Sequence, residues 1–248
     1  MNVNLKAVLA LASPFRAARA PTMAAALMGA TLLANAPAQA VPILFEADLA
    51  PLSGSGVSGL AALSLDGNIL TVNITASGLT PGQPHAQHIH GRFDSAGNPI
   101  NSVTPTLAQD TDGDGFIELA EGLPSYGPII LNLDQPPGSG QFPTAPSGTI
   151  NFLQTYDLSS TPSFAPGFGM ADILPLDLRE IVLHGRFLEA GQGLPPGEAD
   201  GTAGYKGVLP VAAGEIRPVT VPEPASLALF GAGLFGLGLV RRFRARQV

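Results

Sequence analysis

The sequence contains no cysteine and no tryptophan, and only 12% of its 248 residues are charged. Without cysteine the chain has no disulfide bond, no thiolate nucleophile and no cysteine metal ligand. Basic residues are scarcest between residues 41 and 220, where 18 acidic residues stand against five basic ones and the net charge is −13. Such a surface repels nucleic acid and attracts cations, so we expect no nucleic-acid partner.

The usual sequence signatures of catalysis are absent as well. The chain has no G-x-S-x-G nucleophile turn, no phosphate-binding glycine loop and no H-E-x-x-H zinc motif. Its scattered carboxylates are more typical of a solvated surface than of an acid/base pair. The absences therefore favour a non-enzymatic role.

Among the features that are present, the first is a targeting segment at the N-terminus. Basic residues precede a short apolar run at residues 23–34, and the A-x-A sequence of residues 38–40 follows. This order is typical of a cleavable signal peptide. The run is too short to span a bilayer, which takes about 20 apolar residues. We expect residues 1–40 to be a signal peptide and the mature chain to begin near Val41.

The C-terminal end combines three parts. Pro222-Glu223-Pro224 is followed by an uncharged apolar stretch at residues 225–240 and then by an arginine cluster. As a helix the stretch would cover about 24 Å, slightly less than a hydrocarbon core of about 30 Å, and the arginines would mark its cytoplasmic side. An ordinary tail anchor would also fit this pattern.

The three parts in this order resemble the PEP-CTERM sorting signal, which exosortase handles in Gram-negative bacteria that make an extracellular polymeric matrix. The resemblance implies that residues 221–248 form a sorting signal with a transmembrane helix. It also implies transient anchoring in the inner membrane, processing by an exosortase-type enzyme and delivery to the cell surface.

Residues 41–220 have the length of one domain. Short apolar groups in this segment are separated by glycine and proline turns, which favours an all-β sandwich or barrel with Greek-key connections. We expect strands at residues 43–49, 60–65, 69–75, 86–93, 128–133, 149–156, 180–187, 207–211 and 215–219. The Gly- and Pro-rich segments 135–147 and 188–204 should be long surface loops.

An acidic segment at residues 110–121 has the ligand spacing of a calcium loop. Calcium takes six to eight oxygen ligands, and a 12-residue loop supplies them at fixed positions around a central glycine. The segment resembles an EF-hand or dockerin-type loop, although Pro105 precedes it and we expect Gly122 and Pro124 to truncate any helix that follows. A solvated Asp/Gly turn without metal is the alternative. The candidate calcium ligands are Asp110, Asp112, Asp114, the Phe116 carbonyl and Glu121.

The four histidines are His85, His88, His90 and His184. On a strand, His88 and His90 share a face because side chains repeat every two residues. Imidazole is a common copper and zinc ligand, so a third histidine from another strand would complete a three-nitrogen site. A buried polar network, in which each ring bonds a backbone carbonyl, is the alternative. The sequence His-Gly-Arg-Phe occurs at residues 90–93 and again at 184–187, and on paired strands the two copies would bring their histidines together.

The segment 78–90, with a glycine-leucine turn and an H-x-x-H-x-H run, resembles the copper-ligand strand of Cu/Zn superoxide dismutase. It is also similar to the A-x-H-I-H-G motif of CHRD domains. Residues 181–184 and 201–206 resemble the late copper histidine and the glycine-rich loop of the dismutase. The resemblance implies a dismutase-like or CHRD-like β domain with His88, His90 and His184 as copper or zinc ligands, and with His85 as a structural histidine.

This chain departs from the dismutase pattern. No histidine lies between Gly91 and Leu183, so the bridging and zinc-ligand histidines are missing, and Lys206 stands in place of the substrate-guiding arginine. We therefore expect an exported cell-surface or extracellular-matrix protein that is calcium-stabilised, metal-binding and non-enzymatic, with extracellular polysaccharide or matrix as its partner. A copper-dependent, superoxide dismutase-like oxidoreductase is the alternative.

Overall fold

The structure is a computed structural model that describes residues 41–220, 229–236 and 242. The expected signal peptide lies outside the described residues, as do the Pro-Glu-Pro motif and most of the arginine cluster. Of the apolar stretch at residues 225–240, only residues 229–236 are described, and they are helical. Within the described parts of the chain, no helix has the length and apolar character needed to cross a membrane.

The described domain is all-β, as the sequence predicts. Its strands pair only in the antiparallel sense. The strands are β1 (Ile43–Pro51), β2 (Ser58–Asp66), β3 (Ile69–Ser77), β4 (Gln87–Phe93), β5 (Pro99–Ile100), β6 (Ile129–Asn132), β7 (Thr149–Asp157), β8 (Arg179–Leu188), β9 (Gly204–Glu215) and β10 (Arg217–Pro218). The short helical segments between them are η1 (Leu107–Gln109), α2 (Leu119–Tyr126), α3 (Met170–Ile173) and η2 (Leu176–Leu178).

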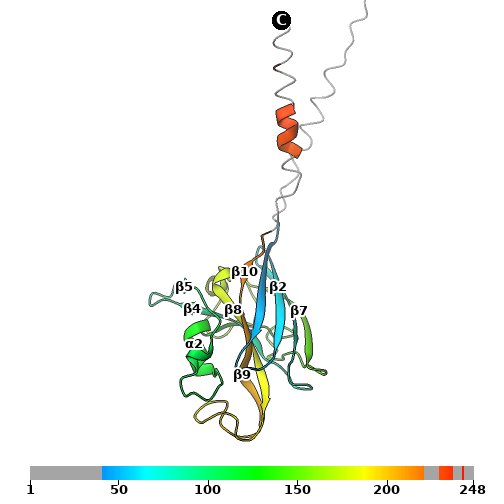
Figure 1. The fold of residues 1–248 in the computed structure, drawn as a ribbon. Coiled ribbons are helices and arrows are strands. Elements are labelled where there is room, and N and C mark those ends of the chain that lie inside the picture. The colour runs from blue at the N-terminus through cyan, green and yellow to red at the C-terminus, as the bar shows by residue number, and fades with distance from the viewer. Residues whose placement is uncertain (1–40, 221–228, 237–241, 243–248) are drawn as a thin grey trace, which may run out of the picture. The chain divides into compact units, whose positions relative to one another are not determined.

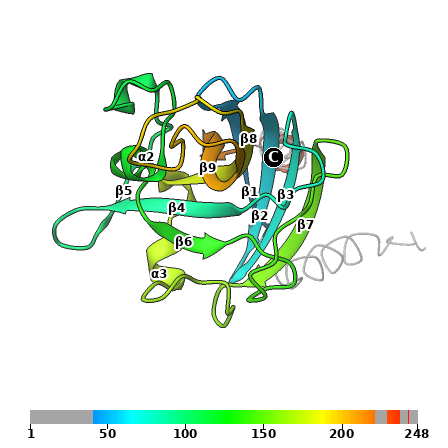
Figure 2. The same ribbon diagram turned by 90° about the horizontal axis from the view of Figure 1, so that it is seen from below.

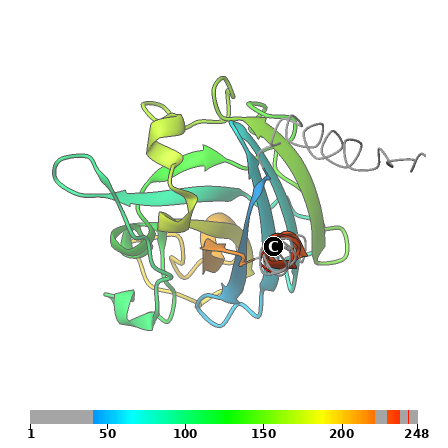
Figure 3. The same cartoon turned by 90° about the horizontal axis from the view of Figure 1, so that it is seen from above.

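The strands follow the order β5-β4-β8-β9-β1-β2-β3-β7, with β10 beside β1 and β6 beside β4. Strands β1, β2, β3 and β7 form one curved layer, and β4, β6, β8 and β9 face it (Figures 1 and 2). Figure 3 shows the same curved layer from the opposite side. Several neighbours in the sheet are distant in sequence, because β9 pairs with β1 and β8 pairs with β4. This order confirms the prediction of a Greek-key sandwich or barrel.

The core lies between the two layers and follows the two-residue period of the strands. In β3, for example, Leu70, Val72 and Ile74 are fully buried against it. The turn that precedes β3 contains Gly67 at φ 57°, which is the positive φ that the expected tight hairpin needs. The hairpin β2–β3 therefore forms where the sequence places it.

Strand β9 differs from the prediction of two segments, because it runs without interruption through Ala212 to Gly214. These small residues pair with β8 on one side, and two of them also pair with β1 on the other. A Cβ atom at Gly214 would collide with the backbone carbonyl of Asp48. Close approach of β1 thus accounts for a glycine that looks like a strand break in the sequence.

Strands β4 and β8 are buried on both faces, and this positions the candidate site. On one face Ile89 and Ile181 join the main core. On the other face Val182 packs with Ile117 and Tyr126, which belong to the segment that carries α2. The segment thus covers the outer face of β4 and β8, and side chains that would otherwise meet solvent are enclosed there.

Candidate metal centre

The structure brings His88, His90 and His184 together under this cover. His88 and His90 lie two residues apart on β4, and His184 comes from β8, which pairs with β4. One ring nitrogen from each histidine lies within 4.8 Å of the other two. The two copies of the His-Gly-Arg-Phe sequence therefore lie on paired strands, although a β-bulge at His184 shifts the register beside β9.

Backbone carbonyls determine which nitrogen of two rings carries the proton. His90 donates from Nδ1 to the Gly127 carbonyl at 2.8 Å, and His184 donates from Nδ1 to the Val208 carbonyl at 2.7 Å. In a neutral imidazole the other nitrogen is then a bare acceptor. Nε2 of both rings is buried and has no hydrogen-bond partner, and the same holds for Nδ1 of His88. Each of the three clustered histidines therefore has a buried ring nitrogen without a hydrogen-bond partner.

Burial keeps these rings neutral. It lowers the pKa of His90 to about 3, with a further contribution from the nearby His184, and it lowers the pKa of His184 to about 4. The pKa of His88 falls well below its usual value, first through burial and then through repulsion by the other two histidines. Neutral imidazole is the form that binds metal, so the cluster is prepared to act as a ligand set near neutral pH.

This donor set fits copper or zinc. Three imidazole nitrogens suit either ion, and the carbonyl bonds at the opposite nitrogens are the kind that orient metal-binding histidines. The alternative of a buried polar network accounts for only one nitrogen each of His90 and His184. The remaining nitrogens are unpartnered, and buried polar atoms without a partner need an explanation. The residues present could hold a metal ion.

Two aromatic side chains enclose the cluster. The ring of Tyr126, from α2, lies edge-on to His90 with centroids 4.7 Å apart. Phe142, from the expected loop at residues 135–147, lies edge-on to His88 with centroids 5.3 Å apart. Neither residue has a sequence signal that links it to the histidines, since both come from loops or short helices that the strand pattern does not place.

His85 lies outside the cluster and supports it. It is fully buried, and its Nδ1 and Nε2 lie 3.0 Å from the backbone carbonyl oxygens of His184 and Thr80 respectively. A Cβ atom at Gly185, which has φ 106°, would collide with Tyr205 and press on His85. Glycine at this position therefore lets β8 pass close to the ring.

Sequence reasoning missed Glu180, which shares the outer face of β8 with His184. Its Cα is paired with that of His90 across the ladder. The side chain is fully buried and neither carboxylate oxygen has a hydrogen-bond partner. Burial raises the pKa of Glu180 to about 8, although the nearby Thr104 side chain acts to lower it and repulsion from Glu215 adds slightly to the rise. The same two-residue period that selects the histidines would have placed this carboxyl beside them.

The acidic loop brings part of its expected ligand set together. One carboxylate oxygen from each of Asp110, Asp112 and Asp114 lies within 4.8 Å of the others. Glu121 instead accepts hydrogen bonds from the amide and hydroxyl of Thr111, at 2.6 and 2.7 Å. Phe116 packs its side chain into a small apolar cluster beneath the loop. The calcium site stays a prediction.

The helix that follows the loop is longer than expected. Helix α2 continues through Gly122 and Pro124 to Tyr126, although proline in a helix interior costs about 3 kcal/mol relative to alanine. At the end of the helix, Tyr126 packs against His90 and Ile117. Before the loop only the 3₁₀ turn η1 forms, in agreement with the expectation that no helix leads into it.

Two other places in the described domain have different chemistry. Lys206 is paired with Asp200 at 2.6 Å and with the hydroxyl of Thr202 at 2.9 Å, so its charge is neutralised locally.

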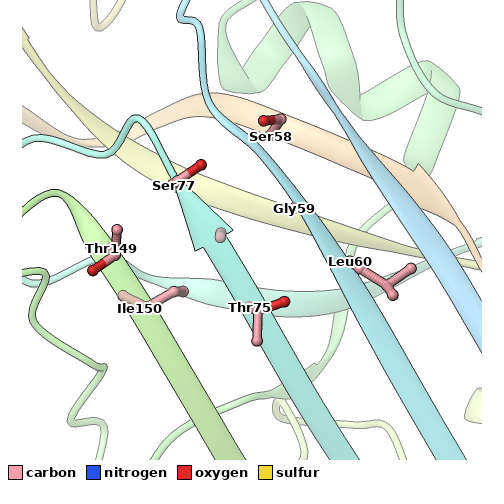
Figure 4. Close-up of a pocket in the computed structure, with 8 residues that line it drawn as sticks. Ser58, Gly59, Leu60, Thr75, Ser77, Thr149 and Ile150 are labelled. Carbon is pink, nitrogen blue, oxygen red and sulfur yellow. The ribbon is translucent and has the colours of Figure 1, made fainter.

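A shallow hollow at the ends of β2, β3 and β7 is lined by uncharged side chains, among them Ser58, Thr75 and Thr149 (Figure 4). It contains no titratable or metal-binding side chain.

Comparisons with known proteins agree with one part of the sequence analysis. Residues 220–242 match the model of the PEP-CTERM protein-sorting motif. Among solved structures, a mutant of superoxide dismutase 5 from Candida albicans matches with 12% sequence identity and a TM-score of 0.31, over 75% of this chain and 98% of that one. No curated protein sequence matches the chain. The chain carries a PEP-CTERM sorting motif, the recognition signal for exosortase processing, and this motif indicates an exported protein of a Gram-negative bacterium.

Proposed function

We propose that this exported protein binds copper or zinc through His88, His90 and His184 and serves as a metal-binding component of the cell surface or extracellular matrix. One observation carries the proposal: three buried imidazoles each have an unpartnered nitrogen, and one ring nitrogen of each lies within 4.8 Å of the other two. Each unsatisfied buried polar atom costs about 1–3 kcal/mol, and a cation at their centre would satisfy all three.

The chain's own residues prepare the site. The carbonyls of Gly127 and Val208 hold the Nε2 atoms of His90 and His184 inward, while Tyr126 and Phe142 restrict the entry of water. When bound, a copper ion would supply redox chemistry and a zinc ion would supply Lewis acidity. The three nitrogens leave further coordination positions for a second ligand.

Metal binding without turnover is favoured over dismutation. The domain carries a net charge of −13 between residues 41 and 220, which repels an anionic substrate such as superoxide. Lys206, which stands where the dismutase family has its substrate-guiding arginine, is paired with Asp200. A copper-dependent oxidoreductase remains the second candidate, because the donor set leaves open coordination positions.

Calcium binding by the loop at residues 110–121 is a separate part of the proposal. The support is the cluster of Asp110, Asp112 and Asp114, to which the Phe116 carbonyl and Glu121 would add. Calcium at this position would stabilise the segment that continues into α2 and covers the histidines. Extracellular sites of this kind work with dissociation constants of about 0.1–1 mM.

The cellular route completes the proposal. Residues 1–40 act as a signal peptide, residues 41–220 form the exported domain, and residues 221–248 hold the chain in the inner membrane until exosortase acts. The mature domain then joins extracellular polysaccharide or matrix at the cell surface. The sorting motif at residues 220–242 supports this route.

The deciding experiment measures the metal content of the purified full chain by mass spectrometry before and after loading with copper or zinc. The comparison is the His88→Ala, His90→Ala, His184→Ala triple variant, with a His85→Gln variant as a control for loss of a buried histidine outside the cluster. About one ion per chain, retained in His85→Gln and lost in the triple variant, supports the site. Equal metal content in all three proteins refutes it. A superoxide assay on the copper-loaded chain separates binding from turnover.

A further inference from the structure

A cavity lies beside the histidine cluster, between α2 and the outer faces of β4 and β6. Its volume is about 340 Å³. The lining residues are His90, Leu119, Ala120, Leu123, Tyr126 and Ile129. Leu123 is half-exposed at the edge of the cavity, so a small molecule can enter from solvent.

Most polar side-chain atoms of the lining already have hydrogen-bond partners. The Tyr126 hydroxyl donates to the Leu119 carbonyl at 3.4 Å, and Nδ1 of His90 donates to the Gly127 carbonyl. Only Nε2 of His90 is unpartnered, and it belongs to the histidine cluster. The remaining wall is aliphatic. A charged ligand would lose its hydration here without gaining a partner, so the chemistry selects an uncharged and largely apolar molecule.

The volume of the cavity and the side chains that line it limit which uncharged ligands fit. An apolar cavity of about 150 Å³ is enough for benzene, and ligand pockets begin at about 300 Å³, so this cavity has room for one or two fused rings. The rings of His90 and Tyr126 already meet edge-on at 4.7 Å, and a planar guest can stack on them in the same manner. We propose that the cavity binds a small uncharged aromatic molecule of one or two rings, in contact with the ring of His90.

The position of the guest links it to the metal centre. A ligand in contact with His90 would occupy space beside one of the three coordinating residues. This second step rests on the proposed function, since it needs a metal at the cluster. With a metal bound, the aromatic molecule would be either a ligand next to the metal site or a substrate of that site. The cavity itself does not depend on the metal.

Indole is a suitable probe, because the chain contains no tryptophan and adds no indole fluorescence of its own. Metal-free full chain is titrated against a fixed indole concentration in detergent-free buffer, and the emission maximum is followed. Transfer of indole into an apolar cavity predicts a saturable shift to shorter wavelength. In the Ala120→Phe variant the new ring fills the cavity from an exposed helix position, and the saturable shift is expected to disappear.

Ala96→Phe provides the matched control, since Ala96 is exposed and lies outside the lining. This variant should bind indole as the parent does, and circular dichroism should show that both variants are folded. Absence of a saturable shift in the parent, or an unchanged shift in Ala120→Phe, overturns the cavity proposal.

Copper loading separates this proposal from the metal site. If indole alters the visible absorption of the copper-loaded parent but not that of Ala120→Phe, the link to the metal is supported, and an unaltered absorption refutes that link. Saturable indole binding in a chain that takes up no metal would refute the metal function and leave the cavity proposal standing.

Discussion

Arg179 is fully buried, and its guanidinium donates hydrogen bonds to two separate backbone segments. It donates from Nε to the Ile173 carbonyl, from Nη2 to the Asp172 carbonyl and from Nη1 to the Arg92 carbonyl. Its guanidinium also lies over the ring of Phe93. The side chain thus connects α3 to the end of β4, the strand that carries two of the clustered histidines.

Replacing Arg179 by lysine should be destabilising although the charge is kept. An ammonium group lacks the planar fork, and the carbonyls that it fails to reach are left unsatisfied at about 1–3 kcal/mol each. We expect the free energy of unfolding to fall by about 2–4 kcal/mol in urea titrations. Arg217→Lys is the control, because Arg217 is largely exposed and should change stability little. Equal stability of the two variants would contradict this role.

Glu180 gives a pH-dependent prediction with a definite sign. Burial raises its pKa to about 8 in the folded protein, whereas an unfolded chain has a glutamate pKa near 4.5. The folded state therefore holds an extra proton between these values, and the stabilisation is present below pH 4.5 and lost as the pH rises through 8. Glu180→Gln has no such loss.

Urea titrations of metal-free protein at pH 5 and pH 8 test this sign. The free energy of unfolding of Glu180→Gln, taken relative to that of the parent, should be higher at pH 8 than at pH 5. We expect a difference of about 1.4 kcal/mol or more, the equivalent of at least one pKa unit. The exposed Glu46→Gln variant should show no comparable change. If the free energies of unfolding of Glu180→Gln and the parent differ by the same amount at pH 5 and pH 8, the Glu180 carboxyl does not have a raised pKa in the folded protein.

At the scale of elements, α2 connects the acidic loop to the histidines. Glu121 of the loop lies in its first turn, and the helix ends at Tyr126, which contacts His90. Gly122 makes this possible, since a Cβ atom there would collide with the Tyr126 ring. The helix can therefore fold its terminal aromatic back along its own surface.

Gly122→Ala tests this arrangement against helix propensity. Alanine in a helix interior is favoured over glycine by up to about 1 kcal/mol, but displacement of Tyr126 should outweigh this gain. We expect a lower melting temperature and weaker metal binding by the cluster, measured by differential scanning calorimetry and by metal titration. Gly169→Ala is the control, because its Cβ atom would meet open space. A stabilised Gly122→Ala variant would show that Tyr126 has room to move.

At the scale of the whole molecule, calcium should act on folding stability through mass action. Asp112 is the best residue for the test, because its carboxylate accepts a hydrogen bond only from the Asp114 amide. Burial, and repulsion by the neighbouring carboxylates, raise its pKa, so losing the charge should not harm the metal-free fold. A ligand that binds the folded state alone raises the melting temperature.

Asp112→Asn should therefore melt below the parent in millimolar calcium and at the parent's temperature or slightly above it in chelator. Asp48→Asn, on an exposed strand position, should respond to calcium as the parent does. If calcium leaves the melting temperature of the parent unchanged, the loop is a solvated turn.

The overall fold was predictable because alternation and turn residues are local signals. Strand β3 and its hairpin follow directly from the sequence pattern. The repeated motif pointed to a link between two histidine segments if their strands paired, and β4 and β8 do pair. What local patterns do not contain is the cover over the outer face, so Tyr126, Phe142 and the partners of Arg179 could not be predicted. These contacts join loops that are distant in sequence and depend on how the strands are ordered in space.

The pairing of the first and last strands brings both ends of the domain to one pole. Phe45 of β1 pairs with Pro218 of β10, and the Val219 amide donates to the Leu44 carbonyl. At the far end of β1, about 25 Å away at 3.3 Å per residue, Ser53 accepts a hydrogen bond from Ile117 of the acidic loop. The acidic loop therefore contacts the end of β1 that lies opposite the end where residues 43–45 meet residues 217–219.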